Sequence, residues 1–247
     1  MHIKFKLDQP LVLPVNYHHS LQALVYSIFP QQEASYLHDQ GYHYNNRAYK
    51  LFCFSKIKAK KAIYDNSSKK ITFHDRISIS ISSILPELIE KTTNQLLTTE
   101  NLLLNGEKLK IDSIQFSQNS VTTNSLQVKA NSPITVYSTY EKRDGSKITH
   151  YFSPHDQVFE HLIQENFARK YEAFTNESLE HEKELLSIRP VRVINRDKVV
   201  TKYKNIWITG WTGTYELKAK PEYLSFLLNA GLGSRNSSGF GFISPFH

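Results

Sequence analysis

Cysteine is almost absent from this sequence, and that scarcity excludes two kinds of site. The one cysteine, Cys53, has no partner for an internal disulfide and cannot build a zinc site from several thiolates. No hydrophobic run approaches the roughly 20 residues that span a bilayer. The opening residues alternate polar and apolar side chains, which indicates a strand and not a signal peptide. We therefore expect no membrane segment and a reducing, cytoplasmic location.

Acidic residues are also in deficit, with 23 against 30 basic ones, a net charge of +7 and a pI of about 9.2. The basic residues are clustered. Eight Lys or Arg and one acid lie between Arg47 and Lys70, and six Lys or Arg and one acid lie between Arg189 and Lys204. Two such segments could line one groove for a phosphate backbone. The alternative is that both are solvated basic surface.

Hydrophobic periodicity in the first half predicts a strand, a helix, two strands, a helix and a strand. In the helix around 17–28, Tyr17, Leu21, Leu24, Val25 and Ile28 have helical spacing. Asn16 is its predicted N-cap. A short extra helix is predicted over 34–40, closed by Gly41. The remaining predicted elements are strands around 3–7, 49–57, 71–81 and 107–116, and a helix over about 84–99.

The second half repeats this order more loosely. A long helix is predicted within 154–174, with Val158, Leu162, Ile163 and Phe167 on its apolar face. A second helix begins at Pro221. The predicted strands lie at 126–130, 134–140, 185–194, 204–219 and 239–246.

The order βαββαβ thus occurs twice, which is the pattern of a ferredoxin-like domain. We predict the α+β fold class, with two tandem ferredoxin-like domains and a cleft between them. The predicted domains are 1–120 and 121–247, because the polar stretch 117–125 marks a boundary.

Glycine is scarce as well, yet four of the nine glycines fall between Gly231 and Gly241. Glycine allows positive φ and close backbone approach. The segment follows a predicted helix and precedes the last predicted strand. Its pattern is G-h-G-x-x-N-x-x-G-h-G, where h is an apolar residue and x is any residue. This pattern resembles the RNA-binding loop of the CRISPR-associated RAMP superfamily. The alternative is an ordinary connection rich in turn residues, which would not need Gly-x-Gly at both ends.

Within that superfamily, the whole chain resembles the sixth CRISPR-associated family, the endoribonuclease that cuts precursor CRISPR transcripts. The stretches "LPVNYHHSLQALVYSIF", "YLHDQG" and "YKLFCFS" carry this resemblance. It implies RNA contacts from the loop, where exposed N–H groups could cradle phosphate oxygens, and from nearby basic strands. The RNA-binding residues that we predict are Gly231, Gly233, Ser234, Arg235, Asn236, Gly239, Gly241, Arg192, Lys202 and Lys56.

The resemblance also implies a reaction that needs no metal and no cofactor. The RNA 2′-hydroxyl attacks the adjacent phosphorus, leaving a 2′,3′-cyclic phosphate and a 5′-hydroxyl. The family's tyrosine, histidine and lysine match Tyr26, His38 and Lys50. His38 would be the general acid or base, Tyr26 would polarise the 2′-hydroxyl or the leaving oxygen, and Lys50 would stabilise the phosphorane. The sequence shows no tight Asp and Glu cluster for two Mg²⁺ ions.

Some of these assignments leave alternatives. The stretch "DQGYHYNNRAY" between His38 and Lys50 is longer than expected and contains His43, the alternative catalytic histidine. His18 and His19 are weaker candidates. Trp207 and Trp211 lie four residues apart in a predicted strand, so they share a face. They could stack RNA bases, but packing in the core is the favoured interpretation.

The expected partner is CRISPR repeat RNA in precursor transcripts, with transient contact to an effector complex and a possible homodimer. The alternative function is a non-catalytic RAMP subunit that binds guide RNA in an effector complex. Such a subunit would have no need for Tyr26, His38 and Lys50. A general basic RNA-binding protein would explain the charge but not the glycine-rich loop.

Overall fold

The structure, a computed structural model, describes residues 1–117, 120–182 and 185–246. The helices are α1 (His18–Ile28), α2 (Gln31–Asp39), α3 (Pro86–Thr98), α4 (Val158–Thr175) and α5 (Pro221–Ala230). The strands of the first half are β1 (His2–Lys6), β2 (Leu11–Pro14), β3 (Tyr42–Tyr44), β4 (Arg47–Tyr49), β5 (Phe52–Phe54), β6 (Lys58–Ala59), β7 (Ala62–Asp65), β8 (Lys70–Phe73), β9 (Arg76–Ser83), β10 (Leu102–Leu104) and β11 (Glu107–Gln115). Those of the second half are β12 (Ser125–Ile134), β13 (Tyr137–Glu141), β14 (Lys147–Tyr151), β15 (Ser187–Arg192), β16 (Lys198–Tyr203), β17 (Ile206–Lys218) and β18 (Ile243–Pro245).

The first half folds into an antiparallel sheet with the order β10-β11-β1-β9-β5, and β6 also pairs with β9. Counted along the chain, β1, β5, β9 and β11 are the four strands of the βαββαβ unit. Their order in the sheet, fourth-first-third-second, is that of a ferredoxin-like domain. Helix α1 connects the first two of these strands, with α2 after it, and α3 connects the last two.

The second half repeats this topology. Its sheet has the order β15-β17-β12-β18, with β16 pairing the far end of β17. Helix α4 leads to β15, and α5 leads to β18. The predicted α+β fold with two ferredoxin-like domains is therefore confirmed. The boundary stretch 117–125 includes residues 118 and 119, which lie outside the described residues, and the division at residue 120 stays a prediction.

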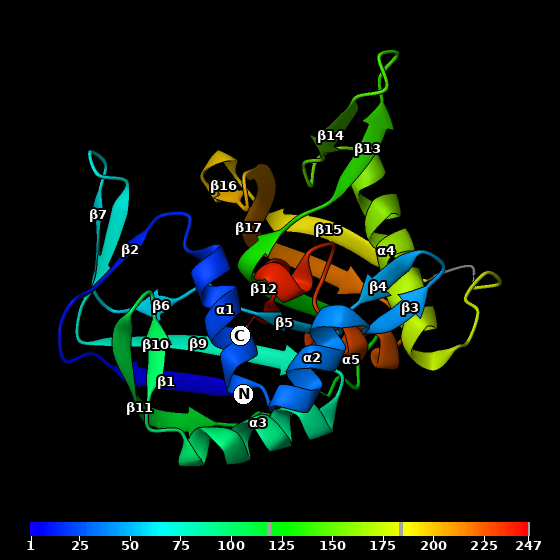
Figure 1. The fold of residues 1–247 in the computed structure, drawn as a ribbon. Helices are drawn as coiled ribbons and strands as arrows, with labels where there is room; N and C mark the ends of the chain where they lie inside the picture. Colours follow the sequence, from blue (N-terminus) through cyan, green and yellow to red (C-terminus); the bar gives the residue numbers. More distant parts are fainter. Residues whose placement is uncertain (118–119, 183–184, 247) are drawn as a thin grey trace.

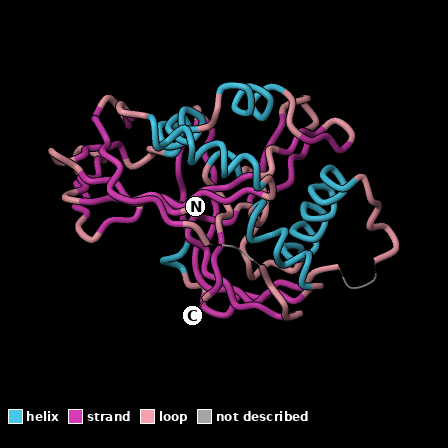
Figure 2. Tube along the Cα trace, turned by 90° about the horizontal axis from the view of Figure 1, so that it is seen from below, coloured by secondary structure: helices cyan, strands magenta, loops and turns pink. Residues whose placement is uncertain are grey.

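Three smaller sheets extend from this framework. Strands β3 and β4 form a hairpin after α2, β13 and β14 form a longer one before α4, and β2, β8 and β7 make a separate sheet. Figure 1 shows the β13–β14 hairpin above α4 and the β3–β4 hairpin beside it, while Figure 2 shows the same chain from below. Within the described ranges, no helix combines the length and the apolar character that crossing a membrane requires.

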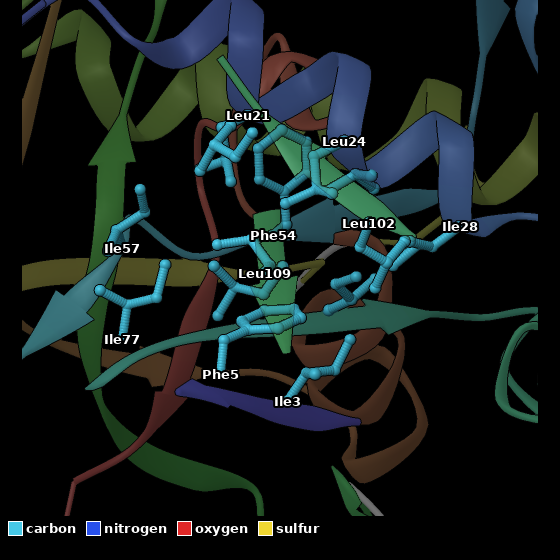
Figure 3. Packing of buried hydrophobic residues seen from close by; sticks show 14 of the residues in the cluster. Ile3, Phe5, Leu21, Leu24, Ile28, Phe54, Ile57, Ile77, Leu102 and Leu109 are labelled. Carbon is cyan, nitrogen blue, oxygen red and sulfur yellow. The ribbon is translucent and has the colours of Figure 1, made fainter. Parts of the chain in front are cut away.

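The core of the first half forms between α1 and its sheet. Leu21, Leu24 and Ile28 of α1 are each 2% exposed or less, as their helical spacing predicts. They lie over Phe5 and Phe54 of the sheet (Figure 3). Burying one such side chain contributes about 1.5–3 kcal/mol to the stability of the fold. These three residues therefore hold α1 in place against the sheet.

Two predicted strands are divided in the structure. The alternating run 71–81 becomes β8 and β9, which belong to different sheets, because Asp75 takes a left-handed φ of 63° between them. In the run 49–57, Tyr49 ends β4 and the short strand β5 follows separately, because Leu51 has a φ of 53° between them. Periodicity cannot detect these breaks, since the alternation of apolar residues continues across them.

Three smaller predictions are also corrected. The N-cap of α1 is Tyr17, without a side-chain bond, because the Asn16 carboxamide instead accepts hydrogen bonds from the second half. Val158 at the start of α4 is 44% exposed, and its neighbour Phe159 is the residue that enters the core. The predicted strand 134–140 is split between the end of β12 and the start of β13.

Candidate active site

The glycine-rich loop, residues 231–241, lies at the junction of the two halves. It begins at Gly231, which ends α5 with a φ of 87°, and it contains a short 3-10 turn over Asn236–Ser238. This turn contacts α1 and β5 of the first half. In Figure 1 the red coil of the loop lies next to α1 and β12. Segments from the two halves of the chain therefore meet here, as the predicted cleft requires.

The glycines of the loop face protein. A side-chain carbon on Gly231 would lie 2.9 Å from Cβ of Cys53, and one on Gly239 would lie 2.7 Å from Cε2 of Phe54. The N–H groups of both glycines donate to backbone carbonyls. These glycines let the loop pack against β5, and the half-buried segment 234–238 is the part left to face a ligand.

Lys170 of α4 holds the loop from within the protein. Its ammonium donates to Gly231 O at 2.5 Å, to Gly233 O at 3.3 Å and to Oδ1 of Asn236 at 3.1 Å. Lys170 is 2% exposed. Burial lowers the pKa of Lys170 to about 7, and the nearby Cys53 acts in the opposite direction. Lys170 was not among the residues that we predicted from the sequence.

Asn236 spans the loop. Its amide nitrogen donates to Leu232 O at 3.2 Å and Phe240 O at 3.1 Å, while its oxygen accepts from Lys170. This side chain thus shapes the loop through internal hydrogen bonds. Direct contact of Asn236 with RNA stays a prediction.

Helix α1 is joined to the loop at Ser237. Gln22 donates from Nε2 to Ser237 O at 2.7 Å and accepts a hydrogen bond from the Tyr203 hydroxyl. One turn further along α1, burial raises the pKa of Tyr26 to about 12, and a hydrogen bond to the Ser237 side chain offsets part of this rise. Tyr26 therefore presents a protonated hydroxyl beside the loop at neutral pH.

His38 lies in the last turn of α2, with its ring against Tyr26. The two ring centroids are 5.9 Å apart with an interplanar angle of 81°. Nδ1 of His38 is 2.7 Å from Oδ1 of Asp39, and the His38 side chain is 70% exposed. A carboxylate accepts, so the proton between them belongs to Nδ1. Nε2 is then an unprotonated base in the neutral ring.

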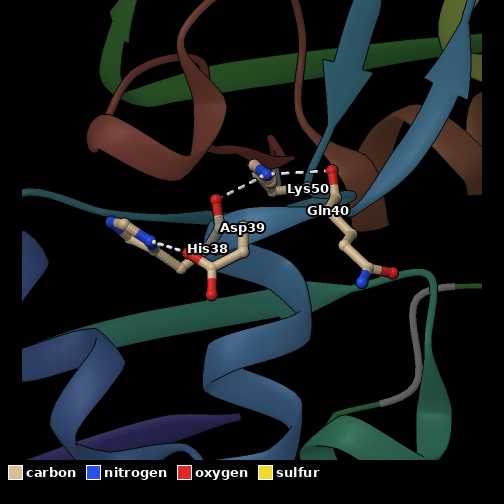
Figure 4. Close-up of polar contacts among 4 residues, drawn as sticks. All are labelled: His38, Asp39, Gln40 and Lys50. Carbon is tan, nitrogen blue, oxygen red and sulfur yellow. Dashed lines mark hydrogen bonds and ion pairs between the residues drawn. The ribbon is translucent and has the colours of Figure 1, made fainter.

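Lys50 lies across the carboxyl end of α2 (Figure 4). Its Nζ donates to His38 O at 2.9 Å and to Gln40 O at 3.1 Å. Gly41 makes this position possible, because a side-chain carbon there would lie 3.0 Å from Cδ of Lys50 and 2.6 Å from Tyr49 O. The Lys50 ammonium has three N–H donors, and the two carbonyls accept two of them. The third N–H is available to a phosphate. Burial lowers the pKa of Lys50, and Asp39 acts against this.

These residues border one interdomain cleft of about 430 Å³. Lys50 lines it from the first half, and Ser234, Arg235 and Ser237 line it from the loop. Tyr26 and His38 stand beside it through their contacts with Ser237 and with each other. The His38 imidazole, the Tyr26 hydroxyl and the Lys50 ammonium thus lie next to the half-buried segment 234–238 of the loop. These are groups that can serve in acid–base catalysis and in the stabilisation of negative charge.

Family models match nearly the whole chain. The model described as CRISPR associated protein Cas6, C-terminal, matches residues 115–245, and the model described as CRISPR-associated protein Cas6, N-terminal, matches residues 12–115. The chain belongs to the Cas6 family.

Individual relatives agree with this assignment. A CRISPR-associated endoribonuclease Cas6 of Methanocaldococcus jannaschii is 26% identical over 248 residues, covering 98% of this chain and 90% of its own length. The CRISPR-associated endoribonuclease Cas6 of Pyrococcus furiosus is 23% identical over 241 residues, covering 96% of this chain and 84% of its own.

Solved structures support the fold. The product of a Cas6-related gene from Pyrococcus furiosus superposes with a TM-score of 0.79 at 18% identity, covering 100% of this chain and 98% of that one. A RAMP protein described as binding different RNA substrates gives a TM-score of 0.78 at 18% identity, with both chains fully covered.

The alternative histidines of this Cas6-family chain lie elsewhere. Tyr42 and Tyr44 face α4, where Tyr42 packs on Phe174 at 5.7 Å between ring centroids and Tyr44 lies near Glu172. His43, between them on β3, therefore points to the opposite face of the hairpin. His19 is exposed, next to the Tyr203 ring at 6.0 Å. The choice of His38 over His43 stays a prediction, and the contact with Tyr26 favours His38.

His18 is a core residue, 4% exposed. Its ring stacks on Phe240 at 5.0 Å and on Tyr17 at 5.7 Å, and within the described part of the chain neither ring nitrogen has a hydrogen-bond partner. Burial lowers the pKa of His18 from 6.5 to about 4, and Lys56 nearby acts in the same direction.

We expect His18 to make the fold acid-sensitive. Above pH 6.5 the ring is neutral in both the folded and the unfolded chain. As the pH falls from 6.5 to 4, only the unfolded chain takes up the proton, so stability falls by up to about 3 kcal/mol. The variant His18→Phe keeps the stack without the titrating group. Urea unfolding at pH 7 and pH 4.5 should show a smaller acid loss in the variant, and an equal loss in both proteins would contradict this account.

The remaining predicted RNA-binding residues lie outside the cleft. Arg192 and Lys202 are exposed on β15 and β16, where the Lys202 N–H donates to Asn16, and Lys56 is half-buried in the first half. Trp211 is 8% exposed and packs in the core of the second half, as the favoured interpretation had it. Trp207, near the start of β17, is instead 60% exposed. Among the residues that the structure describes, no group of three or more His, Cys, Asp or Glu is placed to hold a metal ion.

Proposed function

We propose that this chain is an endoribonuclease that cleaves CRISPR repeat RNA in precursor transcripts without a metal ion. The supporting observation is the assembly of Tyr26, His38 and Lys50 beside the glycine-rich loop at one cleft. The relatives from Methanocaldococcus jannaschii and Pyrococcus furiosus carry the name CRISPR-associated endoribonuclease. The products are a 2′,3′-cyclic phosphate and a 5′-hydroxyl.

In this proposal the RNA supplies its own nucleophile. Nε2 of His38 takes the proton of the 2′-hydroxyl, and the Tyr26 hydroxyl donates to the leaving 5′-oxygen. Lys50 uses its remaining N–H on a non-bridging oxygen, where negative charge accumulates in the phosphorane. A positioned acid or base gives about 10²–10⁴-fold acceleration, and preorganised charge stabilisation gives a factor of similar size.

The substrate would be held by phosphate and base contacts from segment 234–238 and by the basic strands of both halves. Contact with a CRISPR effector complex, homodimer formation and a cytoplasmic location stay predictions from the resemblance and composition. A non-catalytic guide-RNA-binding subunit would need the loop but would gain nothing from the contact of Tyr26 with His38.

The chemistry is tested by incubating the purified protein with repeat RNA in EDTA. We expect cleavage to continue at the same rate, with cyclic phosphate at the new 3′ end. A second RNA has a single 2′-deoxy sugar 5′ of the cut, and we expect no cleavage there. Dependence on a divalent ion, or cutting of the deoxy RNA at that bond, would contradict the proposed mechanism.

A further inference from the structure

Lys170 brings a positive charge into the interior without a counter-charge. It is 2% exposed, and within the described ranges no carboxylate forms an ion pair with it. Lysine is seldom buried to this degree unless a charged partner compensates it. Burial also keeps the ammonium away from RNA, so Lys170 can act only through the groups that it holds.

The three N–H donors of this ammonium match three acceptors of the glycine-rich loop. They bond Gly231 O, Gly233 O and Oδ1 of Asn236. Gly231 and Gly233 have φ values of 87° and 72°, a conformation that glycine adopts readily, and the loop backbone folds around the ammonium. An apolar side chain of similar length, such as methionine, would leave all three acceptors without this donor.

Lys170 also fixes the orientation of the Asn236 amide. Oδ1 of Asn236 accepts from Lys170, while Nδ2 donates to the carbonyls of Leu232 and Phe240 on opposite sides of the loop. A flipped amide would turn its NH₂ group toward the ammonium and its oxygen toward two carbonyls, and neither arrangement forms a hydrogen bond. The lysine therefore stabilises the one orientation in which Asn236 ties the loop together.

The residue after Asn236 connects this network to the proposed acid. Asn236 begins the short 3-10 turn, and the side chain of the next residue, Ser237, forms a hydrogen bond with the Tyr26 hydroxyl. Proton transfer requires a distance of about 2.6–3.2 Å between the heavy atoms. A misplacement of about 1 Å can slow a reaction roughly 10²-fold. A shift of the turn would therefore change how Tyr26 meets the leaving oxygen.

We propose that Lys170 is a positioning residue for cleavage, which holds the loop so that Ser237 directs the Tyr26 hydroxyl toward the leaving 5′-oxygen. Lys170 does not touch the RNA and acts through the loop alone. The assignment rests on the proposed function, in which Tyr26 is the acid. A lysine that only stabilised the fold would affect Tm and leave the cleavage rate of the folded protein unchanged.

The test compares two repeat RNAs that differ in the leaving atom. The second RNA has sulfur in place of the bridging 5′-oxygen at the cut. The 2′-oxygen again bonds to phosphorus, but the P–S bond breaks and the sulfur leaves as a thiolate. Thiols are much stronger acids than alcohols, so this leaving group needs no acid. Single-turnover rates are measured at saturating RNA, well below the Tm of each variant.

Lys170→Met should slow cleavage of the natural RNA by roughly 10–10²-fold, because the acid is misplaced. On the sulfur RNA it should lose less than about threefold, since no acid is needed there. Tyr26→Phe should show the same selective loss. The double variant should be no slower than Tyr26→Phe alone, because Lys170 has no effect on this step except through Tyr26.

Lys218→Met is the matched control, because Lys218 is exposed on β17 and is not part of the cleft lining. It should cut both RNAs at the wild-type rate. If Lys170→Met does not fold, Lys170→Gln keeps N–H donors in the interior and should show a smaller loss of the same selective kind.

The outcomes separate this role from the proposed function. If Tyr26→Phe shows the selective loss but the Lys170 variants lose equally on both RNAs, or lose only Tm, the role of Lys170 is overturned and that of Tyr26 stands. If Tyr26→Phe cuts the natural RNA at the wild-type rate, Tyr26 is not the acid, and both assignments are overturned.

Discussion

Replacing His38 with alanine should reduce cleavage of repeat RNA by roughly 10²–10⁴-fold, the usual contribution of a positioned acid or base. The side chain is 70% exposed, and among the described residues its one polar partner is the adjacent Asp39, so its removal should leave folding unchanged. RNA affinity should also change little, because the loop and Lys50 remain. Single-turnover rates and Kd, measured on the same RNA in EDTA, separate the two effects.

His43→Ala is the control for this experiment. His43 is exposed on the face of its hairpin away from α4, so its removal should change the rate by less than about twofold. The reverse result, with His43→Ala inactive and His38→Ala active, would transfer the catalytic role to His43. A His38→Ala protein that cuts normally would leave the contact with Tyr26 without a function in catalysis.

The second large effect that we expect is on stability, from Gly241→Ala. Gly241 has a φ of 72°, and a side-chain carbon there would lie 1.9 Å from Leu232 O and 2.6 Å from Nδ2 of Asn236. The carbonyl belongs to the other side of the same loop and cannot retreat without opening it. We expect a loss of about 3–5 kcal/mol in the free energy of unfolding, at the upper end for single substitutions.

Gly145→Ala separates backbone strain from packing. Gly145 has a φ of 78°, almost that of Gly241, but nothing lies within 4 Å of an added side-chain carbon. This variant should lose only about 1–2 kcal/mol, the cost of the left-handed conformation. Urea unfolding of both variants measures the difference. Equal losses would mean that the loop relaxes freely and is not held tightly against its surroundings.

The fold was largely predictable because both halves carry strong periodic patterns. Leu21, Leu24 and Ile28 lie where helical spacing places them, and the order βαββαβ follows from such elements. What periodicity misses are the breaks at Leu51 and Asp75, where single residues take left-handed φ values within continuous apolar alternation.

The candidate site was predictable only in part. The resemblance pointed to Tyr26, His38 and Lys50, and the structure brings them together. It gave no sign of Lys170, because a lysine within an amphipathic helix is normally solvated, and its burial depends on carbonyls from the loop. Asn16 was misassigned for the same physical reason. Its partners lie on β16, and a local N-cap pattern cannot reveal them.

The tight contacts of the loop also bear on how the enzyme moves. Gly231 and Gly239 rest against Cys53 and Phe54 with no room for a methyl group, and Gln22 ties α1 to the same loop. Each half has its own hydrophobic core, but these contacts pack the two halves closely together at the loop. We therefore expect the halves not to open and close around a hinge. If the halves keep this arrangement, the RNA has to bend to reach the in-line geometry of the proposed reaction. We then expect the conformational change that precedes cleavage to occur in the RNA and not in the protein.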